Sequence, residues 1–305
     1  MRASAAGAAA LVAALLAGCT PDARPTPQPT VAPSVSTAPQ PSPSAAKGVQ
    51  VEKGIAYSAP DGTELLLDAY LPGDVPAGSG VPAVVVVHGG GFTGGARDAL
   101  DAAPVAAVLA EAGIAAFPVD YRLLPAPFPA ALTDVQAAVR WLREPEQVER
   151  FAIDAGRIGL FGGSAGAILA AEAGTAGSGP QDADARVRAV VALSGLYDSD
   201  PALAASAGPE RDTALAYLGC ADLSDCAAAD DASPLAAVDP TDPPFLVAHS
   251  ADERLPVGSA ERFAAALQAA GIPAILEIRP GDAHSIALLD VALARRILAF
   301  YQEFL

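Results

Sequence analysis

Hydrophobic positions from residue 51 onward fall into two alternating patterns. Short apolar or β-branched runs predict strands, and longer stretches with apolar residues three and four positions apart predict helices. The predicted strands are residues 51–57, 65–71, 81–87, 114–119, 158–161, 187–193, 245–248 and 274–278. The predicted helices are residues 97–112, 128–143, 164–173, 258–270 and 286–304.

This order of elements predicts the fold class. The first two strands flank the turn Pro60-Asp61-Gly62 and form a hairpin, whereas the run 81–87 is typical of a strand buried on both faces of a parallel sheet. Strands that then alternate with helices predict an α/β fold, with a mostly parallel central sheet and helices on both faces. We expect one domain over residues 51–305, with an insertion at about 195–242 that forms a short cap.

The first 50 residues have a different character. Arg2 is followed by a short apolar run and then by Leu16-Ala17-Gly18-Cys19, which resembles a bacterial lipobox. Residues 1–18 are therefore predicted to be a lipoprotein signal peptide and Cys19 the lipidated residue. Residues 19–50, rich in Pro, Ser and Thr, are predicted to be a disordered linker. The expected location is extracytoplasmic and anchored to the bacterial cell membrane through Cys19; the alternative is a secreted protein.

Charge and composition exclude several functions. The chain has 35 acidic against 18 basic residues, a formal net charge of −17, and no cluster of Lys and Arg, which argues against binding to nucleic acid. Its three Cys and three His residues lie in no zinc-ligand or haem-attachment spacing, so we expect no metal and no cofactor. The chemistry is then left to hydroxyl, carboxyl and imidazole groups.

Two glycine-rich motifs follow predicted strands. Gly162, Gly163, Ser164, Ala165 and Gly166 match G-x-S-x-G between a strand and a helix, where a sharp turn exposes the serine hydroxyl. We predict that Ser164 is a nucleophile; the alternative is an ordinary glycine-rich loop.

The second motif is His88-Gly89-Gly90-Gly91, which matches the oxyanion motif of lipases and esterases. Successive glycines let backbone N–H groups approach a ligand closely. We expect His88 itself to have a structural role.

A serine nucleophile needs a base and an acid that orients the base. By elimination the base is His284, in a loop between the last strand and the last helix. The predicted acid is Asp252, just beyond the strand 245–248, which gives the order Ser164, Asp252, His284 expected of α/β hydrolases. Asp198 and Glu253 remain alternatives for the acid.

Several motifs together resemble known esterases. His88-Gly89-Gly90-Gly91, Asp120-Tyr121-Arg122-Leu123, Phe128-Pro129-Ala130-Ala131 and Gly163-Ser164-Ala165-Gly166 are similar to those of hormone-sensitive-lipase-like carboxylesterases. The second half, with Ser233-Pro234-Leu235, His249-Ser250-Ala251-Asp252 and Gly281-Asp282-Ala283-His284, is more similar to bacterial feruloyl and acetyl-xylan esterase-like (BD-FAE-like) enzymes. The resemblance implies an α/β-hydrolase fold and an oxyanion hole formed by the N–H groups of Gly90, Gly91 and Ala165. Phe92, Ser250 and Ala167 stand where the families commonly have Trp, Gly and Gly.

The expected function is that of a serine carboxylesterase acting on a small-molecule ester with a short acyl or aryl group. The alternatives are an exopeptidase or arylformamidase with the same triad, or a lipid-anchored binding protein without catalysis. In the cap, Cys220 and Cys226 are expected to form a disulfide. Four apolar residues either line the substrate pocket or pack the cap: Leu196, Tyr197, Tyr217 and Leu218.

Overall fold

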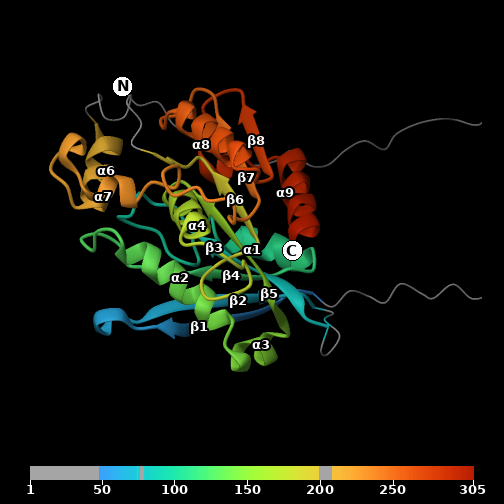
Figure 1. Ribbon diagram of the computed structural model, residues 1–305. Helices are drawn as coiled ribbons and strands as arrows, with labels where there is room; N and C mark the ends of the chain where they lie inside the picture. The colour runs from blue at the N-terminus through green and yellow to red at the C-terminus, as the bar shows by residue number, and fades with distance from the viewer. Residues whose placement is uncertain (1–47, 74, 76–78, 199–207) are drawn as a thin grey trace, which may run out of the picture. The chain divides into compact units, whose positions relative to one another are not determined.

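A central sheet organises the chain (Figure 1). The computed structural model describes residues 48–73, 75, 79–198 and 208–305, so Cys19 and residues 1–47 lie outside the described residues. The strands are β1 Gln50–Ser58, β2 Leu65–Leu71, β3 Val81–Val87, β4 Ala115–Val119, β5 Ile153–Gly163, β6 Ala189–Leu193, β7 Phe245–Ser250 and β8 Ala274–Arg279.

The helices are α1 Ala103–Glu111, α2 Ala130–Leu142, α3 Pro145–Phe151, α4 Ala165–Thr175, α6 Pro209–Leu218, α7 Ala228–Asp231, α8 Val257–Ala269 and α9 Val291–Phe304. Short 3₁₀ turns are η1 Pro60–Gly62, η2 Leu223–Asp225 and η3 Ser285–Leu288. Within the described ranges, no helix is both long and apolar enough to cross a bilayer.

The sheet has eight strands in the order β1-β2-β4-β3-β5-β6-β7-β8. β2 pairs antiparallel with β1 and with β4, and every pairing from β4 through β3 to β8 is parallel. The predicted hairpin and the mostly parallel sheet are confirmed. Because parallel strands present their carboxyl ends at one edge, the loops that follow β3, β5, β6, β7 and β8 meet there.

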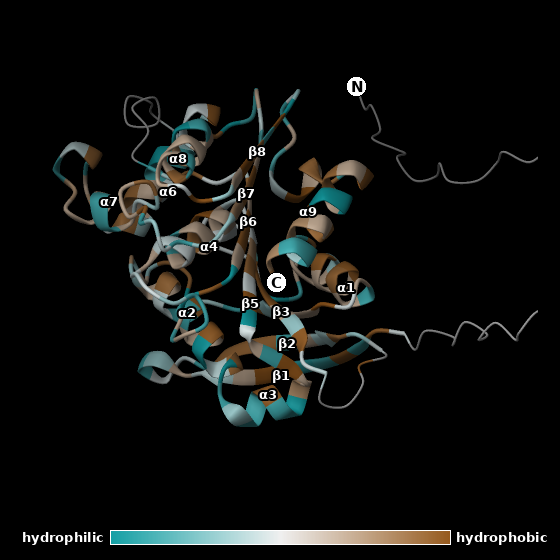
Figure 2. Cartoon of the chain, turned by 45° about the vertical axis from the view of Figure 1, so that its right-hand side comes forward, coloured by the Kyte–Doolittle hydropathy of each residue, from teal (hydrophilic) through white to brown (hydrophobic). Residues whose placement is uncertain are grey.

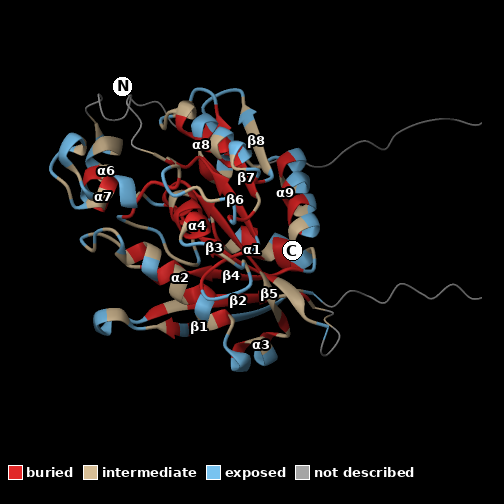
Figure 3. Ribbon diagram, viewed as in Figure 1, coloured by how far each residue is buried: buried red, intermediate tan, exposed pale blue. Residues whose placement is uncertain are grey.

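Two hydrophobic cores fill the spaces on either side of this sheet, and β3 shows how one strand serves both. Val84 and Val86 belong to the core that contains residues of α1 and α9, whereas Val85 and Val87 belong to the core that contains residues of α2, α4 and α8. Side chains of a strand point alternately to its two faces. The helices accordingly lie on both sides of the sheet in Figure 2, and α4 is almost wholly buried in Figure 3.

Two predicted helices begin at least five residues later than expected. The predicted helix 97–112 begins only at Ala103, because the Arg97 backbone N–H donates to Asp120 and its guanidinium forms ion pairs with Asp68 and Asp120. Pro104 stands in the first turn of α1, where proline is well tolerated. The predicted helix 286–304 is divided into η3 and α9, and Asp290 caps α9 by accepting from the Leu293 N–H at 2.8 Å. Helix α3 was not predicted.

The predicted cap contains α6, η2 and α7, which follow β6 in the chain. Cys220 and Cys226 are joined by a disulfide, with their Cα atoms 5.6 Å apart, as predicted. A bridge that closes so small a loop stabilises the folded cap by about 2 kcal/mol.

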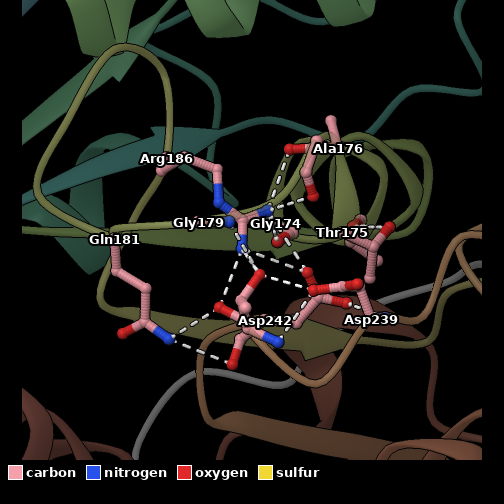
Figure 4. A network of polar contacts seen from close by, with 11 residues as sticks. Gly174, Thr175, Ala176, Gly179, Gln181, Arg186, Asp239 and Asp242 are labelled. Carbon is pink, nitrogen blue, oxygen red and sulfur yellow. Dashed lines mark hydrogen bonds and ion pairs between the residues drawn. The ribbon is translucent and has the colours of Figure 1, made fainter.

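Arg186 is buried and lies at the centre of a network of polar contacts (Figure 4). Arg186, just before β6, donates to the Ala176 and Gly177 carbonyl oxygens at 2.9 Å and to the Thr241 carbonyl oxygen at 2.8 Å. It also pairs with Asp242 at 3.2 Å, and both side chains are buried. Arg186 thereby ties the end of α4 to the segment through which the chain returns from the cap to β7.

Candidate active site

Ser164 lies in the turn between β5 and α4, with the strained backbone angles φ 56° and ψ −122°. Its backbone N–H donates to the Leu193 carbonyl oxygen of β6 at 2.8 Å. The turn is possible because two flanking residues lack a side chain: a Cβ at Gly162 would lie 2.0 Å from the Gly166 carbonyl oxygen, and one at Gly166 would lie 2.1 Å from that of Val87. The predicted strand-turn-helix geometry is therefore present.

His284 is placed against Ser164 by the loop between β8 and η3. The His284 Nε2 lies 2.8 Å from the Ser164 Oγ, within hydrogen-bonding distance. On the other side of the ring, the His284 Nδ1 contacts the carboxylate of Glu253, which is fully buried. The structure therefore brings together a serine, an imidazole and a carboxylate, in the arrangement that activates a serine hydroxyl.

The structure does not bring Asp252, the predicted orienting acid, against His284. Asp252 is exposed, and among the described residues His284 has a carboxylate contact only with the neighbouring Glu253. β7 extends to Ser250, two residues further than predicted, and the Asp252 backbone N–H then donates to the Gly281 carbonyl oxygen at 3.0 Å. This bond holds Asp252 at the surface, and the side chain of the next residue, Glu253, points into the protein toward His284.

The other alternative, Asp198, is also held away from His284. It accepts from the Ser259 Oγ at 2.6 Å and pairs with Arg262. Both partners belong to α8, so Asp198 anchors the start of the cap to that helix.

Glu253 is surrounded by hydrogen-bond donors. Its Oε1 accepts from the Ser194 Oγ at 2.8 Å and the Ser250 backbone N–H at 3.1 Å, and it lies 3.0 Å from the His249 Nδ1. Burial alone would raise the pKa of Glu253, but hydrogen bonds from His284, Ser194 and Ser250 outweigh it and hold that pKa below its usual value. Glu253 is therefore ionised beside the imidazole at neutral pH.

The sequence reasoning did not single out Ser194. The only signal was its position directly after the buried run 189–193, at the edge where the other site residues gather.

The loop after β3 carries the predicted oxyanion motif. His88 is buried, with its ring stacked on Tyr121 at 4.3 Å between centroids, and the Gly89 N–H donates to Asp101 at 2.7 Å. Burial lowers the pKa of His88. His88 thus has the structural surroundings predicted for it. Gly90 begins a turn in which its carbonyl oxygen accepts from the N–H groups of Thr93 and Gly94.

A cavity of about 210 Å³ opens beside Ser164. Gly91, Phe92 and Ala165 form part of its wall, so two of the three predicted oxyanion donors border the same space as Ser164. The remaining lining combines apolar side chains with the charged Glu210 and Arg254; it consists of Ile168, Leu196, Pro209, Glu210, Thr213, Ala214, Arg254 and Leu255.

Of the four cap residues expected to line the pocket or pack the cap, Leu196 lines the cavity. Tyr197 is fully buried against Phe263 of α8, and Tyr217 and Leu218 pack with the core beneath α6.

Tyr217 joins helix α6 of the cap to the loop after β3 and to α4. Its ring stacks on Phe92 of that loop at 3.8 Å between centroids, and its hydroxyl donates to Glu172 of α4 at 2.6 Å. Glu172 is buried, and its other oxygen has no hydrogen-bond partner within the described residues. Burial raises the pKa of Glu172 to about 8, although the bond from Tyr217 acts in the opposite direction.

The raised pKa of Glu172 predicts a pH-dependent stability. Between about pH 4.5, the ordinary value, and about pH 8, the folded protein keeps a proton that the unfolded chain releases, so the free energy of unfolding falls as pH rises through this window. Glu172→Gln keeps an acceptor for Tyr217 and removes the titration. We expect its stability relative to the wild type to increase from pH 5 to pH 8, measured by urea denaturation.

Glu261→Gln, at an exposed carboxylate of α8, is the matched control and is expected to show no such increase. A constant difference between Glu172→Gln and the wild type across this window would contradict the assignment.

The parallel sheet, the strained serine turn and the serine-imidazole-carboxylate contact together define an α/β hydrolase. The family model described as BD-FAE matches residues 67–267, and the chain belongs to this family. Esterase LipC of Mycobacterium tuberculosis is 33% identical over 243 residues, which are 74% of this chain and 58% of LipC. Esterase LipQ of the same organism is 30% identical over 251 residues, which are 79% of this chain and 58% of LipQ. The chain thus spans less than two thirds of the length of these relatives.

Solved structures agree on the fold. A truncated carbohydrate esterase from gut microbiota superposes with a TM-score of 0.74 at 23% identity, covering 86% of this chain and 98% of that one. An acetyl ester-xyloside bifunctional hydrolase from Caldicellulosiruptor lactoaceticus gives a TM-score of 0.66 at 27% identity, covering 79% of this chain and 88% of that one.

Proposed function

We propose that this protein is a serine carboxylesterase whose triad is Ser164, His284 and Glu253. The observation that carries the proposal is the 2.8 Å contact between the Ser164 Oγ and the His284 Nε2, beside an open cavity. The esterase relatives LipC and LipQ and the BD-FAE family support the same reaction class.

In the acylation half, His284 takes the proton of Ser164 while the Oγ attacks the ester carbonyl carbon. Glu253 accepts a hydrogen bond from the protonated Nδ1, which keeps Nε2 free as the base and stabilises the imidazolium that forms. The N–H groups of Gly90, Gly91 and Ala165 stabilise the developing oxyanion. Collapse of the tetrahedral intermediate breaks the ester bond, and His284 protonates the departing alcohol.

In the second half, water releases the acyl group. His284 removes a proton from the water as it attacks the acyl-enzyme, and the proton then returns to Ser164. The positions of the base and the oxyanion donors are the same in both halves, so a single rigid site serves both steps.

The cavity favours short acyl groups. Its volume of about 210 Å³ is smaller than the roughly 300–1,000 Å³ typical of pockets for drug-sized ligands. Its apolar wall of Ile168, Leu196 and Leu255 suits an acetyl to butyryl chain or a small aryl group.

The test uses p-nitrophenyl esters of increasing chain length and a fluorophosphonate probe. We expect kcat/KM to be highest between acetate and butyrate and to fall with longer chains, and the probe to modify Ser164, as located by peptide mass spectrometry. Amide and formamide substrates in the same panel distinguish an exopeptidase or arylformamidase. Absence of both ester turnover and probe labelling would favour a binding protein and sink the proposal.

We also propose that Cys19 anchors the protein to the outer side of a bacterial membrane. Support comes from the Leu16-Ala17-Gly18-Cys19 motif and the linker that follows it. Metabolic labelling with a palmitate analogue is expected to mark the wild type but not Cys19→Ala; equal labelling of both would reject the anchor.

A further inference from the structure

Ser194 lies next to the proposed triad, in a buried position with an unfavourable backbone conformation. It directly follows β6, is completely buried, and has a positive φ of 56°, a region that side-chain-bearing residues seldom adopt. Its backbone N–H donates to the Ala248 carbonyl oxygen of β7 at 2.8 Å, which fixes it between β6 and β7. A non-glycine residue that keeps such a conformation in a buried site suggests that its side chain has a purpose.

The Ser194 hydroxyl joins the acid to the loop that carries the base. Its Oγ accepts from the Ser285 backbone N–H at 2.8 Å and donates to the Glu253 Oε1 at 2.8 Å. A backbone N–H can only donate, and an ionised carboxylate can only accept, so the direction of the hydroxyl proton is determined by its two partners.

These bonds close a ring. The His284 Nδ1 contacts the Oε2 of Glu253, Ser194 donates to the Oε1, and Ser194 accepts from Ser285, which is covalently joined to His284. The imidazole and its own peptide are therefore both attached to one carboxylate. Both arms of the ring end on the carboxylate, and in the arm that passes through Ser194 the two successive hydrogen bonds run in the same direction and strengthen one another.

We propose that Ser194 is a positioning residue of the site: its hydroxyl holds Glu253 and the His284 loop in register, and it neutralises part of the carboxylate charge that faces the imidazole. The catalytic consequence rests on the proposed function, but the contact itself can be tested without any substrate.

The direct test is an NMR titration of His284 in protein labelled with ¹⁵N-histidine. The chain has only three His residues, so the His284 signal can be assigned by its loss in His284→Gln. In Ser194→Ala the carboxylate loses a donor, faces the imidazole with more charge, and holds the imidazolium proton more tightly. We expect the midpoint of the His284 titration to rise by about 0.5 pH or more.

The charged group that contacts His284 is Glu253; Glu253 also accepts from the Ser250 N–H and lies 3.0 Å from the His249 Nδ1. Both remain in Ser194→Ala, so the shift isolates the contribution of one hydroxyl.

Ser250 provides the matched control. Its hydroxyl is equally buried and donates to the Ala283 carbonyl oxygen at 2.5 Å, one residue before His284, and among the described residues it does not bond to Glu253. Ser250→Ala therefore loosens the same loop and keeps the backbone donor to the carboxylate. We expect the His284 midpoint to stay within about 0.2 pH of the wild type. A shift equal to that of Ser194→Ala would assign the effect to loop anchoring and overturn the proposal.

A second variant separates the effect of losing the hydroxyl from the cost of the positive φ. Ser194→Gly relieves the cost of the positive φ but also lacks the hydroxyl, so it should fold where Ser194→Ala does not, and it should show the same rise in midpoint. An unchanged midpoint in either variant would overturn the proposal.

In the active enzyme, both Ser194 variants are expected to lower kcat for p-nitrophenyl acetate by about 10- to 100-fold, as loss of a supporting hydrogen bond commonly does, with KM within about threefold of the wild type. A wild-type kcat would overturn the proposal while leaving the esterase assignment intact. Conversely, a wild type without esterase activity that still shows the NMR shift would contradict only the assigned function.

Discussion

Ser164→Ala is expected to lower kcat for p-nitrophenyl acetate by about 10⁵-fold or more. The Oγ of Ser164 is the atom that would form the acyl-enzyme, and it lies 2.8 Å from the base. Without it, only the oxyanion donors and substrate binding remain, and loss of one such donor costs only about 10²- to 10³-fold. Initial rates at saturating ester, with thermal unfolding to verify the fold, measure the effect.

Ser233→Ala is the control for removing a hydroxyl from a buried serine. The Ser233 Oγ bonds to the Tyr197 carbonyl oxygen at 3.3 Å and to the Ala236 N–H at 3.2 Å, within the cap. Its loss should cost about 1 kcal/mol of stability and leave kcat within about threefold. A Ser164→Ala protein that kept more than about 1% of the wild-type kcat would exclude Ser164 as the nucleophile.

Glu253→Gln is expected to lower kcat/KM by about 10³- to 10⁴-fold, whereas Asp252→Asn should remain within about threefold of the wild type. The glutamine keeps the size of the side chain but can present its NH₂ to His284, which favours the tautomer with the proton on the wrong nitrogen. Asp252 is exposed and takes no part in the contact with His284. Steady-state kinetics on purified proteins of equal stability measure the difference.

These two adjacent carboxylates form a matched pair, because each substitution removes one negative charge from the same acidic loop. A long-range effect of charge would lower both activities alike. The opposite result, a large loss in Asp252→Asn with an active Glu253→Gln, would return the acid role to Asp252.

The sequence predicted those features that depend on local pattern. β2 and β3 have the predicted bounds. For β3 the reason is that a strand buried on both faces excludes polar residues along its length. The serine turn was equally predictable, since G-x-S-x-G between an apolar strand and a helix is itself a local pattern.

The features that were not predicted depend on contacts between distant segments. The end of β7 and the bond from the Asp252 N–H to Gly281 together decide whether Asp252 or Glu253 faces His284. Neither feature can be predicted from the residues around position 252. The late start of α1 likewise follows from the ion pairs of Arg97 with Asp68 and Asp120, which lie 29 and 23 positions away in the chain.

The clamp around Arg186 has a consequence for how this fold can change. It fastens the chain at the exit of the cap, while Ser194 and Asp198 are fastened at its entrance. β6 and β7 are themselves paired in parallel, so both ends of the cap start from fixed points on the sheet. Changes on the face of α6 that lines the cavity would therefore alter which molecules reach Ser164, whereas changes at Tyr217 would also reach Phe92 and Glu172.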